Sequence, residues 1–86
     1  MMKYEREKRI VWESMKIGKE YTAKELSKLC VHMSAREIGI FLGSVKKIFD
    51  GALSYRLVYF THPFSVLRVW RKNKNIPFGA IREKLT

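Results

Sequence analysis

The residues of this chain that could do chemistry are mainly cations. The chain has 18 Lys and Arg residues against 8 Asp and Glu residues, which gives a formal net charge of +10 over 86 residues. A Lys ammonium attracts a phosphate as a point charge, and an Arg guanidinium can also donate two parallel hydrogen bonds to a planar or tetrahedral acceptor. This surplus indicates a polyanionic partner or, as the alternative, only a highly soluble Lys-rich surface.

The cations are not distributed evenly along the chain. Residues 1–50 contain 11 basic and 7 acidic side chains, whereas residues 51–86 contain 7 basic side chains and a single acid, Glu83. We therefore expect the last third of the chain to attract phosphate groups. Its basic candidates are Arg56, Arg68, Arg71, Lys72 and Lys74.

The patterns typical of catalytic and metal sites are weak. His32 and His62 are far apart in the sequence, and Cys30 is the only cysteine. A zinc site normally needs about four ligands with recognisable spacing, and the chain has neither a Gly-rich phosphate loop nor a nucleophile elbow. We expect no enzymatic activity, no metal and no cofactor. Cys30 is expected to be a buried structural residue and His32 a turn residue.

Cysteine usage and hydropathy indicate the compartment. A single cysteine cannot form an intrachain disulfide, which is typical of a reducing environment. The chain contains no run of about 18 apolar residues that could span a membrane, and the charged segment from Lys3 to Arg9 does not resemble a signal peptide. We expect a cytoplasmic, nucleoid-associated protein with no membrane partner.

Two near-copies of one phrase indicate how the central cations are positioned. The segments 22–26 (Thr-Ala-Lys-Glu-Leu) and 34–38 (Ser-Ala-Arg-Glu-Ile) both place a hydroxyl residue three positions before a Glu. This spacing predicts a capping box, in which the hydroxyl and the carboxylate each satisfy a free backbone N–H at a helix start. The sequence therefore predicts a helix over about 23–30, a short turn, and another helix from residue 35.

The helix predicted over 35–49 has the clearest amphipathic pattern in the chain. At about 100° per residue, six apolar side chains fall within one arc of roughly 120°. They are Ile38, Phe41, Leu42, Val45, Ile48 and Phe49. The opposite face is expected to meet solvent and carries Arg36, Gly39, Ile40, Gly43, Ser44 and Lys47. Each glycine costs about 1 kcal/mol in a helix, for which close approach of DNA, a packed partner helix or simple tolerance would account.

Three further elements are predicted around this pair. A helix over about 4–16 ends before Gly18, a short strand covers 20–21, and a last helix covers about 78–85. The aromatic and β-branched content of 53–60 and 64–71 predicts a hairpin over about 53–71, although 64–71 would also fit a helix. The aromatic residues of the hairpin are expected to be core residues, with stacking on single-stranded bases as the alternative. They are Tyr55, Tyr59, Phe60 and Trp70.

In this order of elements, the chain resembles the winged helix-turn-helix superfamily of small archaeal and bacterial transcription regulators. The resemblance as a motif covers residues 22–42 and is carried by Thr22, Glu25, Leu26, Ser27, Leu29, Val31, Ile38 and Leu42. Cys30 stands where the turn glycine is usual, and the turn is longer than in the compact bacterial version. The resemblance implies an α+β fold with a three-helix core, a C-terminal hairpin wing and a short terminal helix.

The resemblance also implies a double-stranded DNA-binding protein, with the 35–49 helix in the major groove and a basic wing on the backbone. The expected contact residues are Ser34, Arg36, Ile40, Ser44, Lys46, Lys47, Arg56, His62, Arg68, Arg71, Lys72 and Lys74. A homodimer formed through the terminal helices is compatible with this function. Two alternatives stay open. One is a winged-helix module that docks onto a protein in a replication, transcription or RNA-processing assembly, and the other is nucleic-acid binding without sequence choice.

Overall fold

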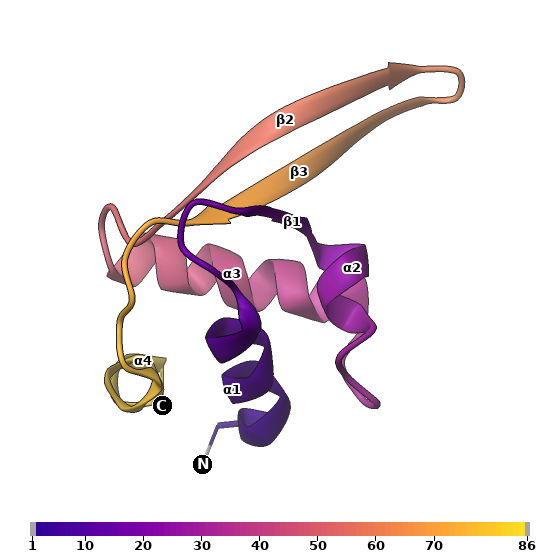
Figure 1. Cartoon of the computed structure of the whole chain (residues 1–86). Coiled ribbons are helices and arrows are strands. Elements are labelled where there is room, and N and C mark those ends of the chain that lie inside the picture. The colour runs from indigo at the N-terminus through magenta and orange to yellow at the C-terminus, as the bar shows by residue number, and fades with distance from the viewer. Residues whose placement is uncertain (1, 86) are drawn as a thin grey trace.

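Four helices and a three-stranded antiparallel sheet make up residues 2–85, the part of the chain that the computed structural model describes (Figure 1). The resulting α+β domain has the element order α1 (Glu5–Ser14), β1 (Glu20–Thr22), α2 (Ala23–Ser27), α3 (Ala35–Ile48), β2 (Leu53–Thr61), β3 (Phe64–Lys72) and α4 (Phe78–Leu85). None of these helices is long and apolar enough to cross a membrane.

Both predicted capping boxes are confirmed. At the start of α2, the Thr22 hydroxyl accepts a hydrogen bond from the backbone N–H of Glu25, and the Glu25 carboxylate accepts one from the backbone N–H of Thr22. Ser34 and Glu37 make the same two bonds at the start of α3, over 3.2 and 3.0 Å. Both helices therefore begin at the positions that the sequence indicates.

Three helices end earlier than predicted. α1 ends at Ser14 because the backbone of Met15 is extended, and α3 ends at Ile48 because Phe49 leaves the helical conformation. α2 ends at Ser27 rather than near residue 30, and the segment 28–34 that follows is irregular. A carboxylate from α1 holds this segment, since Glu7 accepts hydrogen bonds from the backbone N–H groups of residues 31–33.

The core lies between the helices and the base of the sheet. α3 contributes Ile38, Phe41, Leu42 and Val45, all of which are buried, whereas Ile48 is 40% exposed and lies at the rim. α1 contributes Val11 and Trp12, the hairpin base contributes Leu53 and Trp70, and α4 contributes Phe78 and Ile81. α4 lies against α1, with the Arg9 guanidinium 5.4 Å from the centroid of the Phe78 ring.

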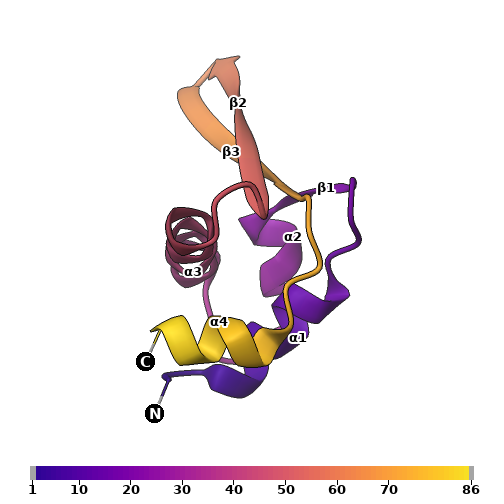
Figure 2. The same ribbon diagram turned by 90° about the vertical axis from the view of Figure 1, so that its left-hand side faces the viewer.

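The sheet has the strand order β1-β3-β2. Residues 64–72 form a strand rather than a helix because β3 pairs with β2 along its whole length and with β1 over residues 69–71. The hairpin extends well beyond the helices, and α1 and α4 lie at the opposite end of the molecule (Figure 2). The expectation of an aromatic core in the hairpin therefore holds for Trp70 but is wrong for Tyr55, Tyr59 and Phe60, which are exposed.

Candidate nucleic-acid interface

One face of α3 is open to solvent along its length. Arg36 and Lys47 are exposed on it, and Ile40 between them is 60% exposed. A Cβ atom added to Gly39 or Gly43 would meet no other atom within 4 Å. Packing among residues 2–85 therefore does not account for the two glycines.

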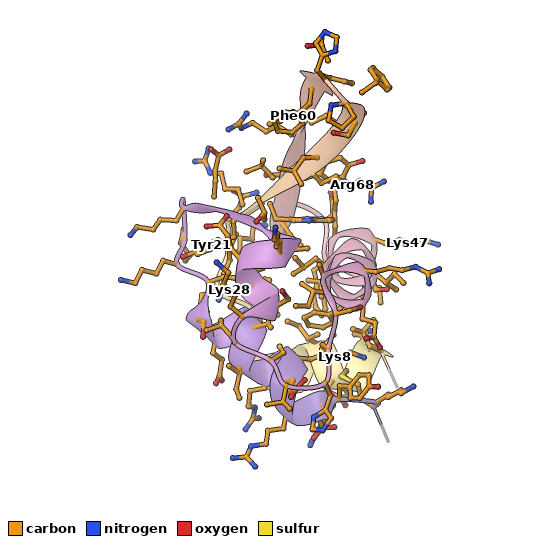
Figure 3. The ribbon with its side chains drawn as sticks, turned by 90° about the vertical axis from the view of Figure 1, so that its right-hand side faces the viewer. Lys8, Tyr21, Lys28, Lys47, Phe60 and Arg68 are labelled. Atoms are coloured by element: carbon orange, nitrogen blue, oxygen red, sulfur yellow. The ribbon has the colours of Figure 1, made fainter. Side chains whose placement is uncertain are left out.

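The ring of Tyr55 joins this helix to the hairpin. The Lys46 ammonium at the end of α3 lies 5.7 Å from the ring centroid, and the Arg68 guanidinium of β3 lies 5.0 Å from it. Trp70 supports the ring from within the hairpin, with the two ring centroids 5.1 Å apart. Cation–π attraction thus places cations from two separate elements around one aromatic platform. Figure 3 shows Lys47 pointing into solvent from α3, on the same side of the molecule as Arg68.

The two serines predicted as contacts serve α3 itself. The Ser34 hydroxyl caps the helix, and Ser44 Oγ donates a hydrogen bond to the carbonyl oxygen of Ile40 over 3.0 Å. The backbone N–H of Ser34, its hydroxyl, and the nearby Lys3 and Lys8 lower the pKa of Glu37, against the opposing effect of partial burial. A carboxylate of this chain therefore occupies the helix N-terminus where a phosphate would bind.

The arginines of the hairpin are divided between its two faces. The register pairs Leu57 with Arg68 on the face that carries Tyr55, whereas Arg56 and Arg71 lie on the other face. Arg56 forms a two-pronged ion pair with Glu20 of β1, with Nε 2.6 Å from Oε2 and Nη2 3.1 Å from Oε1. The hydrogen bond from Arg56 and the charges of Arg56 and Arg71 lower the pKa of Glu20, although partial burial opposes this. Of these three arginines, Arg68 is the one on the same face as Tyr55, whose ring also contacts Lys46 of α3.

Lys72 is excluded from the predicted interface because its side chain is buried. Only 2% of the residue is exposed, and its ammonium donates a hydrogen bond to the carbonyl oxygen of Trp12 over 2.9 Å. Burial lowers the pKa of Lys72, against the opposing charge of Glu13. The sequence could have indicated that Lys72 points inward. Side chains alternate between the two faces of a strand, so Lys72, two residues after Trp70, lies on the same face as Trp70.

The remaining candidates lie at the two ends of the hairpin. His62 is in the exposed turn at the tip, away from the helices. Lys74 follows β3 at the base, where its Nζ would be 3.5 Å from a Cβ atom placed on Gly51. Lys74 is therefore near the C-terminal end of α3, and His62 could reach only a ligand that extends along the hairpin.

The sequence did not indicate two basic residues that lie beside α3. Lys3 and Lys8 line a hollow together with Glu37, Ile40 and Ser44. The Lys8 ammonium is 5.7 Å from the centroid of the Phe41 ring. Desolvation lowers the pKa of Lys8, Glu37 acts in the opposite direction, and Lys3 lowers it further. Lys3 and Lys8 lie near α3 because of the path that the N-terminal segment takes, and this path cannot be predicted from the neighbouring residues in the sequence.

No group of three or more His, Cys, Asp or Glu side chains within residues 2–85 is placed to hold a metal ion. Comparisons of the chain with protein-family models, with curated proteins and with solved structures found no match.

Proposed function

We propose that this chain is a winged helix-turn-helix protein that binds double-stranded DNA, and that it acts as a transcription regulator. The arrangement of elements supports the proposal. A short strand precedes α2, α2 and α3 are joined by an irregular turn, and a hairpin follows α3. The short strand pairs with the second strand of the hairpin, which gives the order β1-β3-β2. In such a fold, α3 would be the helix that enters the major groove, with the hairpin as the wing.

The observation that carries the proposal is the open, cationic face of α3. Arg36 and Lys47 are exposed on it, and the contacts around Tyr55 continue the positive surface to Lys46 and Arg68. The chain has no acidic residue between Asp50 and Glu83. Glu37, in the first turn of α3, is bonded to the backbone of Ser34. The field on this side of the molecule would attract phosphates and guide association.

The positions of the side chains suggest their roles. Arg36 is in the first turn of α3, from which a guanidinium can donate two hydrogen bonds to the O6 and N7 atoms of a guanine. The exposed Ile40 would pack on a thymine methyl group. Lys46, Lys47 and Arg68 would contact phosphates, and the open space beside Gly39 and Gly43 would allow the backbone of DNA to approach the helix closely.

Fluorescence anisotropy with labelled duplex DNA, single-stranded DNA and RNA of equal length tests this proposal directly. We expect the duplex to bind most tightly, with an affinity that falls steeply as salt rises. Selection from a random duplex pool at two salt concentrations then tests sequence choice. An enriched motif supports a regulator. Binding without an enriched motif indicates an architectural role, and no duplex binding at low salt refutes the proposal.

One observation favours a second candidate, a protein-interaction module. Ile40 is a large apolar side chain that is 60% exposed, and the surface beside it at Gly39 and Gly43 is free of other groups. A partner helix could pack closely there. Capture of a partner that persists after nuclease treatment, and is lost on substitution Ile40→Lys, would favour this candidate over DNA.

A further inference from the structure

The outer half of the hairpin has large apolar side chains on both of its faces. Tyr59, Phe64, Val66 and Leu57 lie on the face that carries Tyr55, and their exposed fractions are 64%, 78%, 47% and 42%. Phe60 and Leu67 lie on the other face and are 45% and 37% exposed. Exposed apolar surface gathered in one region is typical of an interaction site rather than of an ordinary monomer surface.

No element within residues 2–85 covers this region. β1 pairs with β3 only at residues 69–71, which leaves the outer half of the hairpin without a neighbour on either side. β2 is the edge strand of the sheet over its whole length, so its outward backbone N–H and C=O groups have no strand partner. Charged residues and proline on an edge strand usually prevent pairing with another chain. Residues 57–61 of this edge contain neither.

The charge distribution distinguishes between the partners that could cover it. The cations of the hairpin lie toward its base, where Arg56 is paired with Glu20 and Arg68 is held over Tyr55. A polyanion or an anionic lipid surface would require cations at the outer half. Because residues 57–61 of β2 are uncharged, the same segment of a second copy could pair with them. Such pairing would place no like charges directly opposite one another.

The apolar side chains of β2 supply part of the area that a dimer interface requires. At about 200 Å² per aromatic side chain, the exposed fractions of Tyr59 and Phe60 on β2 correspond to roughly 220 Å² on each copy. This is about a quarter of the approximately 800 Å² that each partner contributes to a standard interface, which is the scale of a weak, concentration-dependent dimer. Leu57, Val58 and the backbone edge of β2 supply further area.

We infer that the hairpin is a homodimer interface, in which β2 pairs antiparallel with β2 of a second copy around Tyr59. Apolar side chains on both faces fit this arrangement, because edge pairing would place Tyr59 beside Tyr59 of the second copy on one face and Phe60 beside Val58 of the second copy on the other. A partner docked on one face alone would leave the other face exposed. A two-fold arrangement of this kind is closed and self-complementary.

Sedimentation equilibrium of the full chain without nucleic acid, over a concentration series, tests the dimer independently of DNA binding. We expect a monomer–dimer equilibrium, and we expect the double substitution Tyr59→Lys with Phe60→Lys to raise the dimer dissociation constant at least tenfold. Val31→Lys is the matched control, because Val31 is 88% exposed and lies outside the hairpin. Unchanged circular dichroism of the variants excludes loss of the fold.

Cysteine cross-linking tests the register in a Cys30→Ser background. Antiparallel pairing around Tyr59 would place the thiols of two Tyr59→Cys copies close enough for a disulfide. Val66→Cys lies on β3, so two β2 strands would separate its thiol from the thiol of the other copy, and no disulfide should form. A dimer that cross-links through residue 66 but not 59 contradicts the edge pairing. A monomeric mass at all concentrations overturns the inference, and in that case sedimentation with anionic vesicles or duplex DNA that is lost in the double variant identifies the partner instead.

Discussion

The ammonium group of Lys72 lies 4.3 Å from the centroid of the Trp12 ring while it donates a hydrogen bond to the carbonyl oxygen of the same residue. Trp12 Nε1 in turn donates a hydrogen bond to the carbonyl oxygen of Ile76 over 2.7 Å. Through these contacts a single residue of α1 is bonded to the end of β3 and to the segment that leads into α4. Lys72 is thus a structural cation that joins the sheet to the helices.

Removal of this cation is expected to destabilise the fold without changing DNA binding. Lys72→Ala removes a charge-assisted hydrogen bond and leaves a void, and we expect a loss of about 2 kcal/mol in the free energy of unfolding, measured by urea denaturation. Lys72→Met fills the space and should lose less. The salt dependence of duplex binding by Lys72→Met should equal that of the unmodified protein, and a smaller slope would place Lys72 at a phosphate.

Two cations of α3 are expected to differ in what they contribute to DNA binding. Arg36→Ala should relax the preference at one base position, at a cost of about 1–3 kcal/mol on the preferred sequence. Lys47→Ala should weaken binding to all sequences alike and reduce the salt slope by about 1. Binding measured on the selected motif and on a scrambled duplex separates the two effects. Equal behaviour of the two variants would contradict the proposed orientation of α3.

The two faces of the hairpin should also behave differently. Arg68 adjoins Lys46 across Tyr55, so Arg68→Ala is expected to reduce duplex affinity and the salt slope. Arg56 is engaged by Glu20 on the opposite face, so Arg56→Ala should leave both nearly unchanged. Anisotropy titrations at three salt concentrations compare this matched pair. A larger effect of Arg56 than of Arg68 would mean that the other face of the sheet meets DNA.

Acid should loosen the segment between α2 and α3. Partial burial of Glu7 opposes its ionisation, but hydrogen bonds from the backbone of residues 31–33 and from the His32 side chain lower its pKa below the ordinary 4.5. A lowered folded-state pKa contributes stability that is present above the unfolded value and is lost as the pH falls through the folded value. Glu7→Gln should therefore be less stable at neutral pH.

A pH series of urea denaturation from about pH 7 to pH 3 checks this expectation. The unfolding free energy of Glu7→Gln should fall less steeply with acid than that of the unmodified protein. Some acid dependence should remain, because the pKa values of Glu20, Glu25 and Glu37 are also lowered. Equal slopes for the two proteins would show that the contact with residues 31–33 does not contribute to stability.

The sequence could predict the features that depend on neighbouring residues. A capping box needs only a hydroxyl residue and a Glu three positions apart, and both boxes form as predicted. The apolar periodicity of α3 identified the buried side chains from Ile38 to Val45 for the same reason. It failed at Ile48, which is the last residue of the helix and is 40% exposed.

Features that depend on distant segments were not predictable in this way. The burial of Lys72 requires the Trp12 carbonyl, 60 residues earlier in the chain, and the path of residues 31–33 requires Glu7. Strand alternation indicated which hairpin residues share a face, but it could not indicate that the core ends halfway along the strands. For this reason Tyr59 and Phe60 resemble core residues in the sequence and meet solvent in the structure.

β3 begins in solvent at Phe64 and ends in the core at Trp70 and Lys72. The stability of the fold is therefore expected to depend mainly on the buried residues at the end of this strand and little on the exposed residues at its start. The outer part of the hairpin could be shortened, or exchanged for an unrelated turn sequence, without unfolding the domain. The inferred dimer contact and the core would then lie in separate halves of the hairpin, so that association and thermodynamic stability could be engineered separately.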